Sequence, residues 1–477
     1  MKIKTLSYIF IALAFAIVCS CNDEESFAVS ESKVLTFSID TLKMDTLFSN
    51  VPSAAKSFWA YNRSGDGLRC RSVRLENGAN SGFRVNVDGI YLGENTDYQT
   101  NEVEIRNKDS IRIFVEVTLP KANADEPKLQ EDNLVFTLES GVEQKVNLNA
   151  WAWDATMLRD VRISKDSTLQ SYGKPIVIYG GLRVDSAATL TLAPGTTLYF
   201  DANAGMDVYG KLISLGNAEA NVVLRGDRID RMFNYLPYDR VPAQWMGIHF
   251  YESSYGNEIN YTDIHSTNTG IEIDSADVSK QKLTISHSSV HNCQGYGLHS
   301  VNARLSMLDC QVSNTLYDCV QIEGGNVDVN NCTFAQFYPF DARRGAAFAF
   351  SDSKPLQRLN VLNSLITGYA DDLLSGAISD TTTAKNYLFD HCVIRTPKIT
   401  SADSIRFVNV IYEDVKDTTS MGEKHFVKVD TENLIYDFRL DSVSAAIGKA
   451  NPLTALPDDR NGVRRDEKPD IGAFEYK

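Results

Sequence analysis

Long apolar runs are scarce in this chain of 477 residues, and so are the signs of helix. After about residue 20 no segment has the ~20 consecutive apolar residues that a membrane-spanning helix needs. Sustained 3.6-residue periodicity is also hard to find, whereas Val, Ile, Thr, Tyr and Phe are frequent. With only 13 Pro and 29 Gly, the composition is neither fibrous nor disordered. We therefore expect an all-β globular protein.

Several kinds of binding chemistry are also missing. The net charge of -15 repels phosphate backbones, so we expect no nucleic-acid partner. No CxxC pair, His/Cys cluster of zinc-like spacing, phosphate loop, nucleophile elbow or HExxH is present. We expect no cofactor and no metal, and nothing in the sequence supports a calcium ion.

The first residues have the pattern of an export signal. Lys2 and Lys4 precede an apolar run from Tyr8 to Cys19, too short to span a bilayer comfortably but suited to a signal peptide. The run ends in Val18-Cys19-Ser20-Cys21, which resembles the bacterial lipobox. That resemblance implies a signal peptide at 1–20, cleavage before Cys21 and lipid on its sulfur.

An acidic stretch follows the lipobox. Asn22-Asp-Glu-Glu25 is similar to the surface-export signal of some Gram-negative lipoproteins, and residues 21–32 then form an acidic tether. The resemblance implies an outer-membrane protein that is anchored by lipid and faces the cell surface. Its first expected partner is therefore the membrane itself.

Residues 33–153 carry the pattern of a β-sandwich. Short strand-like runs such as Ile111–Val117 and Asn133–Leu138 alternate with turn signals such as Asn77-Gly78. About eight strands in ~120 residues are typical of a two-sheet sandwich. The segment resembles immunoglobulin-like domains in architecture, although the Cys…Trp…Cys pattern of antibody domains is absent.

A repeat of ~22 residues follows. Leu283, Leu305 and Val327 are each separated by 22 residues, and apolar or small residues recur at offsets 0, 2, 5 and 7 from them. Offsets 0 and 2 predict one short inward-facing strand, and offsets 5 and 7 predict a second. A third strand completes each copy, for example Gly297–Ser300. Three short strands per repeat predict a parallel β-helix over residues 160–440.

The change of phase between the first two strands requires a corner at offset 4. Asn, Asp and His, the non-glycine residues that most readily adopt left-handed backbone conformation, occupy that offset in every copy. The resulting corner ladder is Asp263, His287, Asp309, Asn331, Asn363, His391 and Asn409.

These repeats resemble the right-handed parallel β-helix superfamily that includes pectate-lyase-like proteins. The handedness is implied by the resemblance and not by the spacing. Within residues 441–477, Asp459–Arg465 and Asp470–Tyr476 resemble the terminal motif of bacterial surface β-helix proteins. We expect this segment to be a C-terminal cap that closes the open sheet edge.

The resemblance raises the question of polysaccharide cleavage. Of the polygalacturonase-type motifs, only an acid pair, Asp371-Asp372, is present. Asp390-His391 resembles a lyase signature, but His391 belongs to the corner ladder. Without a complete catalytic motif, we favour a surface protein that binds or scaffolds glycan. A β-helix polysaccharide lyase or glycoside hydrolase and a structural or adhesive surface protein remain as alternatives.

Two insertions indicate where a glycan would bind. Gly226–Ala243 and Tyr338–Gly345 each enter the third strand of a coil and therefore project from the same corner. Tyrosines recur along this corner, and arginines beside them suit carboxylate or sulfate groups. We expect an external groove lined by Tyr238, Arg240, Tyr317, Tyr338, Arg343, Arg344 and Tyr369.

Six cysteines lie beyond the signal region. Cys310 and Cys332 occupy the same inward position one coil apart, about 4.8 Å if the strands are in register. That distance permits a disulfide, but parallel side-chain directions are poorly aimed for one. We expect buried, reduced thiols.

Overall fold

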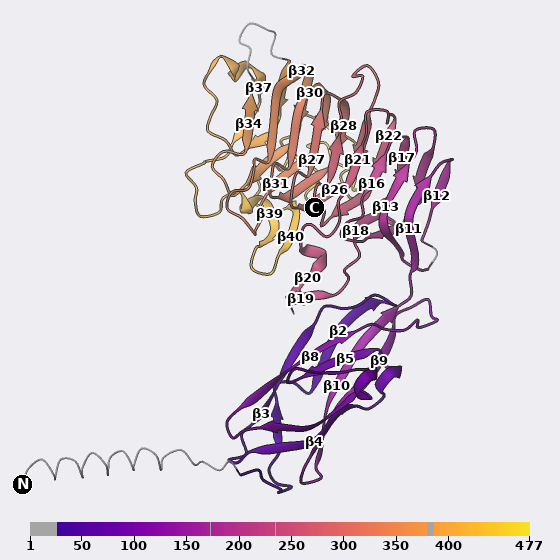
Figure 1. The fold of residues 1–477 in the computed structure, drawn as a ribbon. Coiled ribbons are helices and arrows are strands. Elements are labelled where there is room, and N and C mark those ends of the chain that lie inside the picture. Colours follow the sequence, from indigo (N-terminus) through magenta and orange to yellow (C-terminus); the bar gives the residue numbers. More distant parts are fainter. Residues whose placement is uncertain (1–25, 172, 234, 379–385) are drawn as a thin grey trace, which may run out of the picture. The chain divides into compact units, whose positions relative to one another are not determined.

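The computed structural model describes residues 26–171, 173–233, 235–378 and 386–477, and the chain divides after Asp154 into two compact units. Strands and short 3₁₀ helices make up the regular structure of these residues, which contain no α-helix (Figure 1). No described helix is long and apolar enough to cross a membrane. The all-β class is confirmed. The expected lipidation site, Cys21, lies outside the described residues.

The first unit consists of two five-stranded sheets around one core. Alternate residues of β8 are buried, among them Ile113 and Val115, because one face of each sheet is turned inward. Neighbouring strands are antiparallel except for β2 and β10. One sheet has the order β1 (Leu35–Phe37), β3 (Lys56–Asn62), β8 (Ser110–Val117), β5 (Phe83–Val87), β6 (Ile90–Leu92). The other has the order β2 (Thr41–Phe48), β10 (Glu143–Trp153), β9 (Lys128–Leu138), β4 (Leu68–Leu75), β7 (Gln99–Ile105). Two 3₁₀ turns, η1 (Gly78–Asn80) and η2 (Glu94–Thr96), connect strands of this unit.

The second unit is the predicted parallel β-helix, in which short strands of successive coils pair to form three long sheets (Figure 1). Sheet 1 contains β12 (Ser167–Leu169), β14 (Thr189–Leu192), β17 (Lys211–Leu215), β22 (Asn257–Asn260), β25 (Leu283–Ser286), β28 (Arg304–Leu308), the second halves of β30 (Val320–Asn330) and β32 (Phe348–Leu362), β35 (Tyr387–Asp390) and β37 (Phe407–Val408). Sheet 2 contains the first halves of β11 (Thr156–Ile163) and β13 (Ile176–Val184), β15 (Thr197–Phe200), β18 (Val222–Gly226), β23 (Thr262–His265), β26 (Ser289–Cys293), β29 (Gln311–Thr315), β31 (Thr333–Gln336), β33 (Leu365–Gly368), β36 (Val393–Ile394) and β38 (Ile411–Tyr412). Sheet 3 contains the second halves of β11 and β13, β16 (Met206–Val208), β21 (Ile248–Phe250), β24 (Ile271–Ile273), β27 (Leu298–Val301), the first halves of β30 and β32, and β34 (Leu374–Ala377).

Strand register follows the 22-residue repeat. Leu283 pairs with Leu305, and Leu305 with Val327, so like positions of successive coils lie side by side. Their side chains stack in one continuous interior that runs through the coils. The parallel sheets are therefore held together by columns of identical inward positions, as the offsets 0, 2, 5 and 7 predicted.

The corner between sheets 1 and 2 has left-handed backbone in successive coils. Six of the expected residues have φ between 46° and 51°: His287, Asp309, Asn331, Asn363, His391 and Asn409. Asp263 is the exception and corrects the expectation, because it lies within β23 while Tyr261 holds the corner at φ 43°. The apolar pattern aligns Ile259 with Leu283, but in the structure it is the polar residue Asn257 that pairs with Leu283. The expected register of this coil was therefore wrong by two residues.

The residue after this corner donates a side-chain hydrogen bond to a backbone carbonyl oxygen. The buried thiols of Cys310, Cys332 and Cys392 each donate to a carbonyl oxygen two residues earlier. Ser288 and Ser364 donate their hydroxyls in the same way. All six cysteines of the described chain are free and buried, so they serve as small core residues.

The C-terminal segment packs along the side of the β-helix, which corrects the expected closure of its open edge. Hairpin β39 (Phe426–Asp430) and β40 (Ile435–Leu440) and residues 446–474 share an apolar cluster with outward residues of sheet 2, including Leu365 and Val393. Two further 3₁₀ turns, η4 (Ala402–Arg406) and η5 (Glu423–His425), precede the hairpin. The last coils of sheet 2 thus have an apolar outer face because the tail covers it.

The polar corner ladder anchors this tail. Asn363 Oδ1 accepts the Asn451 N–H at 2.8 Å, and Asn331 Oδ1 accepts the Leu456 N–H at 3.0 Å. Asp309 pairs with buried Arg465 at 2.8 Å. Asp309, Asn331 and Asn363 therefore have two structural roles, since they adopt the left-handed corner and also bind the tail.

Candidate functional site

The polar part of the outer face of sheet 2 carries a cluster of one carboxylate and two imidazoles. In β23 the side chain of Ile264 points into the core, so its neighbours Asp263 and His265 point outward. His291 of β26 pairs in register with His265. The two rings consequently stack, with centroids 4.9 Å apart and planes 17° apart.

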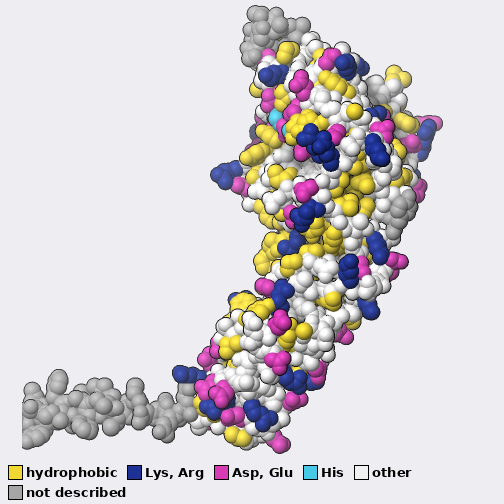
Figure 2. Space-filling model, turned by 45° about the vertical axis from the view of Figure 1, so that its right-hand side comes forward, with side chains coloured by type: hydrophobic (Ala, Val, Ile, Leu, Met, Phe, Trp, Pro, Cys, Tyr) yellow, Lys and Arg dark blue, Asp and Glu magenta, His cyan; other side chains and the backbone are white. Residues whose placement is uncertain are grey.

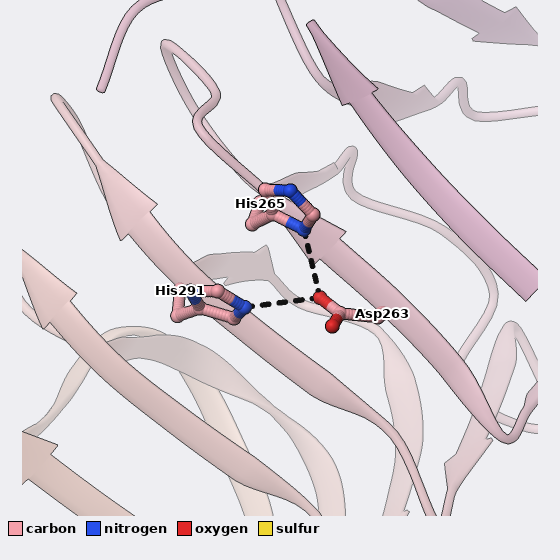
Figure 3. A group of neighbouring side chains, drawn as sticks. All are labelled: Asp263, His265 and His291. Carbon is pink, nitrogen blue, oxygen red and sulfur yellow. Dashed lines mark hydrogen bonds and ion pairs between the residues drawn. The ribbon is translucent and has the colours of Figure 1, made fainter. Parts of the chain in front are cut away.

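Asp263 lies between the two histidines (Figure 3). Its Oδ1 atom is 2.9 Å from Nδ1 of His265 and 3.0 Å from Nε2 of His291. On the other side of His265, Nε2 is 2.8 Å from Oδ1 of Asp239. Arg225 in turn lies 2.8 Å from the same Asp239 oxygen. The site is an ion-pair chain that runs Arg225–Asp239–His265–Asp263–His291.

Electrostatics keep Asp239, His265 and Asp263 charged. Burial disfavours the imidazolium of His265, but Asp263 and Asp239 outweigh it and raise the pKa of His265 to about 9. Burial also disfavours the Asp263 carboxylate, but His291 and His265 hold its pKa well below the ordinary value. For Asp239, the hydrogen bond and charge of His265 overcome burial and lower the pKa to about 2. At neutral pH both acids are ionised and His265 is a cation.

Asp239 is placed by the insertion after β18. A short hairpin, β19 (Arg231–Phe233) and β20 (Leu236–Pro237), is followed by the turn η3 (Tyr238–Arg240). Buried Ser266 donates its hydroxyl to the Asp239 carbonyl at 2.6 Å, which fixes the backbone over β23. The guanidinium of Arg228 stacks on the ring of Tyr238 at 3.8 Å. Tyr238 therefore supports the insertion from within.

A cleft of about 360 Å³ lies over the cluster. The insertion supplies one wall, with Asp239 and Arg240, and the C-terminal hairpin supplies the other, with Tyr436 and Phe438. Arg240 Nη1 donates to the carbonyl of Asn433 at 2.8 Å and joins the two walls. The floor comes from three adjacent strands of sheet 2 and consists of Asp263, His265, Ser289, His291, Gln311 and Ser313.

Two polar atoms in the cleft lining have no partner within the described chain, the Tyr436 hydroxyl and Oδ1 of Asn314. Asn314 is 2% exposed and has a left-handed backbone at φ 55°, and its Oδ1 accepts no hydrogen bond. A buried amide oxygen without a donor is costly. A hydroxyl of a bound molecule or water in the cleft would satisfy it.

The groove expected around the second insertion is not open. Tyr338 is only 4% exposed, and Tyr369 is half-buried against Phe337, which also contacts the C-terminal hairpin. The expectation was wrong for these two residues. The hairpin, which begins more than 50 residues after Tyr369, packs on Phe337 beside Tyr369, and the buried ring of Tyr338 contacts Phe340 of its own insertion. Of the expected ligand-binding residues, Arg240 alone lines the cleft over Asp263.

The remaining expected ligand-binding residues lie outside this cleft. Arg343 pairs with Asp341 of its own loop at 2.9 Å, and its side chain is 89% exposed. Arg344 stacks over Tyr369 at 5.0 Å and donates to the Tyr338 carbonyl. Tyr317 is exposed and contacts Tyr296 edge-on. These residues do not form one site with Arg240.

The acid pair is not arranged as a catalytic dyad. Asp371 is exposed and lies 3.5 Å from buried Arg395. Asp372 accepts a hydrogen bond from the Thr396 hydroxyl at 2.7 Å and one from the Leu374 N–H at 3.4 Å, which closes the turn before β34. Neither acid lines the cleft, and the Asp372 contacts are those of a structural turn.

Sequence reasoning missed the imidazole cluster. Asp263 was assigned to the corner, which left His265 and His291 without a partner. A usable signal was present, because the 26 residues from His265 to His291 equal the spacing from Asn257 to Leu283. This spacing was not recognised because Asn257, although it points inward, is polar and does not fit the apolar pattern. Its side chain donates to the Lys282 carbonyl and accepts from the Leu212 N–H.

Comparison with known protein families identifies the fold of part of this unit. A family model described as a right-handed beta helix region matches residues 241–394, less than half of the chain. The segment that carries the cluster is thus a right-handed β-helix region. None of the curated proteins matches the sequence.

Similarity to solved structures is remote. A protein of unknown function from Porphyromonas gingivalis is 12% identical over 27% of this chain and 59% of that one, with a TM-score of 0.19. The catalytic unit of a GH87 α-1,3-glucanase from Streptomyces thermodiastaticus is 11% identical over 71% and 74%, with a TM-score of 0.27. Dex49A from Penicillium minioluteum is 10% identical over 78% and 73%, with a TM-score of 0.19. Similarity at this level carries no argument about function, and this chain spans less than two thirds of the Porphyromonas protein.

Proposed function

We propose that the second unit binds glycan in the cleft between residues 227–243 and the hairpin β39–β40. The observation that carries this proposal is the composition of the cleft, which combines a floor of carboxylate, imidazole, amide and hydroxyl groups with a wall that holds Tyr436 and Phe438. Sugars offer hydroxyls that donate and accept, together with apolar C–H faces that pack on aromatic rings. The volume of about 360 Å³ is that of an ordinary small-ligand site.

The charge balance of the cleft favours a neutral glycan. Among the groups that line the cleft, Asp239 and Asp263 offset Arg240 and the His265 cation. Arg225 is outside the lining and is paired with Asp239, so no unpaired positive charge faces a uronate or sulfate. Acidic and basic side chains are also interspersed over the face seen in Figure 2, without a large field of one sign. The unpartnered oxygen of Asn314 suits a hydroxyl donor.

Binding is favoured over hydrolysis. Two-carboxylate glycoside cleavage requires one carboxylic acid with a raised pKa to protonate the leaving group. The pKa values of both Asp239 and Asp263 are lowered by His265, so neither acid holds a proton near neutral pH. Release of unsaturated or reducing sugar would support the enzyme alternative.

A panel of immobilised neutral and anionic glycans tests the proposal with residues 22–477. Tyr436→Ala should weaken retention of the bound glycan, because it removes an aromatic ring of the wall. Arg343→Ala is the matched control, since this exposed side chain contacts only its own loop. If Arg343→Ala weakens retention and Tyr436→Ala does not, the binding site is at the second insertion and this cleft is not the site. If neither variant differs from wild type, the structural or adhesive alternative is favoured.

We also propose that Cys21 carries lipid and anchors the protein to the outer membrane, with its folded units at the cell surface. The lipobox-like sequence and the acidic residues after it support this proposal. Cys21→Ala should abolish palmitate labelling, and protease added to intact cells should degrade the wild-type protein. Retained labelling of the variant would disprove the anchor, and complete protection in intact cells would disprove the surface location.

A further inference from the structure

The geometry points to a metal site: Asp263, His265 and His291 bind one divalent transition-metal ion, with Zn²⁺ as the ion that the donors suit best. Their ligand atoms all lie within 4.8 Å of one another. The site is independent of the proposed glycan and would exist whether or not the cleft binds a sugar.

The distances around Asp263 match a shared ion. Two ligand atoms that are each about 2.1 Å from Zn²⁺, and that subtend an angle of about 90–110°, lie about 3.0–3.4 Å apart. The Asp263 oxygen is 2.9 Å and 3.0 Å from the two imidazole nitrogens. All three ligand atoms lie within 4.8 Å of one another, so a shared ion requires the two imidazole nitrogens to close in around it. The side chains already converge, because Asp263 and His265 point outward from the same strand and His291 points outward from the strand paired with it.

A second shell is present around His265. Histidines that bind a metal characteristically use one ring nitrogen and give the other N–H to a carboxylate, which orients the ring. Nε2 of His265 lies 2.8 Å from Asp239, which is itself held by Arg225 at 2.8 Å and anchored through its backbone by Ser266. A metal ion on Nδ1 takes the place of the proton that the free His265 cation holds there, while the Nε2 proton remains hydrogen-bonded to Asp239.

The donor set selects the kind of ion. Two imidazoles and one carboxylate suit Zn²⁺ and its transition-metal neighbours, whereas Ca²⁺ and Mg²⁺ take oxygen ligands. Three protein ligands leave at least one coordination position, and the cleft lies directly over the cluster. Such an open site holds water or an oxygen of a bound molecule, unlike a closed structural zinc site.

The test uses untagged residues 22–477, because a polyhistidine tag would itself bind the probe. After treatment with EDTA and removal of the chelator, the protein is titrated with Zn²⁺ by calorimetry, and with Co²⁺ by visible absorption. We expect one Zn²⁺ per chain and a Co²⁺ absorption band of a low-coordinate site. Binding of Ca²⁺ alone, or of no divalent ion, would overturn the proposal.

Variants assign the ligands. His291→Ala should abolish the site, and Asp239→Asn should weaken Zn²⁺ binding by about 10- to 100-fold through the second shell. His299→Ala is the matched control, because this outward histidine of sheet 3 contacts Glu272 and Glu323 instead. Circular dichroism checks that each variant is folded, and His291→Asn replaces His291→Ala if the latter is not. Stoichiometric, unaltered binding by both His291 variants would refute the assignment.

The same variants separate this site from the proposed function. Tyr436→Ala should keep Zn²⁺ binding, because Tyr436 lies in the wall and is not one of the three ligands. Zinc binding without retention of any glycan would refute the glycan proposal and leave the metal site. Glycan retention by a chain that binds no Zn²⁺ would refute the metal site and leave the glycan proposal.

Discussion

Replacement of Asn363 tests how the corner ladder stabilises the β-helix. Asn363 is fully buried at the corner between sheets 1 and 2, with φ 48°. Its side chain accepts the Asn451 N–H at 2.8 Å and donates to Asn330 at 2.9 Å and Thr454 at 3.1 Å. Two of the three contacts reach the tail, so the substitution should act on tail docking as well as on the corner.

The magnitude follows from these contacts. Each hydrogen bond contributes about 1 kcal/mol, and left-handed backbone costs a residue other than Gly or Asn about 1 kcal/mol more. Asn363→Ala should therefore lower the free energy of unfolding by about 4 kcal/mol, and Asn363→Gly by about 3 kcal/mol because glycine tolerates positive φ. Asn409→Ala is the control, since this exposed corner residue has φ 51° and bonds only to Asp390 and His391.

Urea unfolding measures the stabilities, and hydrogen exchange of the peptide that covers 446–474 reports tail docking. Both Asn363 variants should accelerate exchange in this peptide, whereas Asn409→Ala should not. Wild-type stability in Asn363→Gly would show that the side-chain bonds contribute nothing. Equal stability of Asn363→Ala and Asn363→Gly would contradict the argument from left-handed backbone.

Three further perturbations test the core and its charges. Phe389→Ala should lower the free energy of unfolding by about 3–5 kcal/mol, measured in urea, because the fully buried ring stacks on Phe407 at 5.0 Å and its removal leaves a cavity. The six buried cysteines of residues 22–477 should react with a thiol reagent only after unfolding, and a count of four would reveal a disulfide. Burial opposes the charge of His299, but Glu272 and Glu323 outweigh it and raise the pKa of His299 in the folded protein. The ion pairs of His299 therefore contribute their full stability below about pH 6.5, and this contribution is lost as the pH rises through the pKa of the folded state. His299→Gln should therefore lower the melting temperature more at pH 6 than at pH 9, and an equal effect at both would contradict this sign.

The β-helix could be predicted from sequence because its repeat is local. Each coil places the same residue types at the same offsets, so Leu283, Leu305 and Val327 already define the register. The prediction failed where one coil breaks the pattern, since inward Asn257 replaces an apolar residue and moved Asp263 onto the corner. A buried polar residue of this kind depends on hydrogen-bond partners elsewhere in the fold. A repeat pattern that records only apolar positions does not include those partners.

The cleft could not be predicted because one wall comes from the end of the chain. The residues of its floor follow from strand alternation in β23, β26 and β29. The hairpin β39–β40 has no repeat, and the bond between Arg240 and Asn433 joins it to the insertion. Long-range placement of a non-repeating segment depends on tertiary packing, which local patterns do not encode.

Tail docking and ligand binding should consequently be coupled. The hairpin that carries Tyr436 belongs to the same apolar cluster as Ile471 and Phe474 of the tail, and the tail is bonded to Asn363. A chain whose tail is undocked has an incomplete cleft. The apparent affinity for glycan is therefore reduced in proportion to the fraction of molecules whose tail is docked. Asn363→Ala should thus weaken glycan retention although Asn363 is outside the cleft, and bound glycan should slow exchange of residues 446–474, because coupling is reciprocal. Weaker retention without any change in tail exchange would contradict the coupling, as would full retention by a variant whose tail exchanges freely.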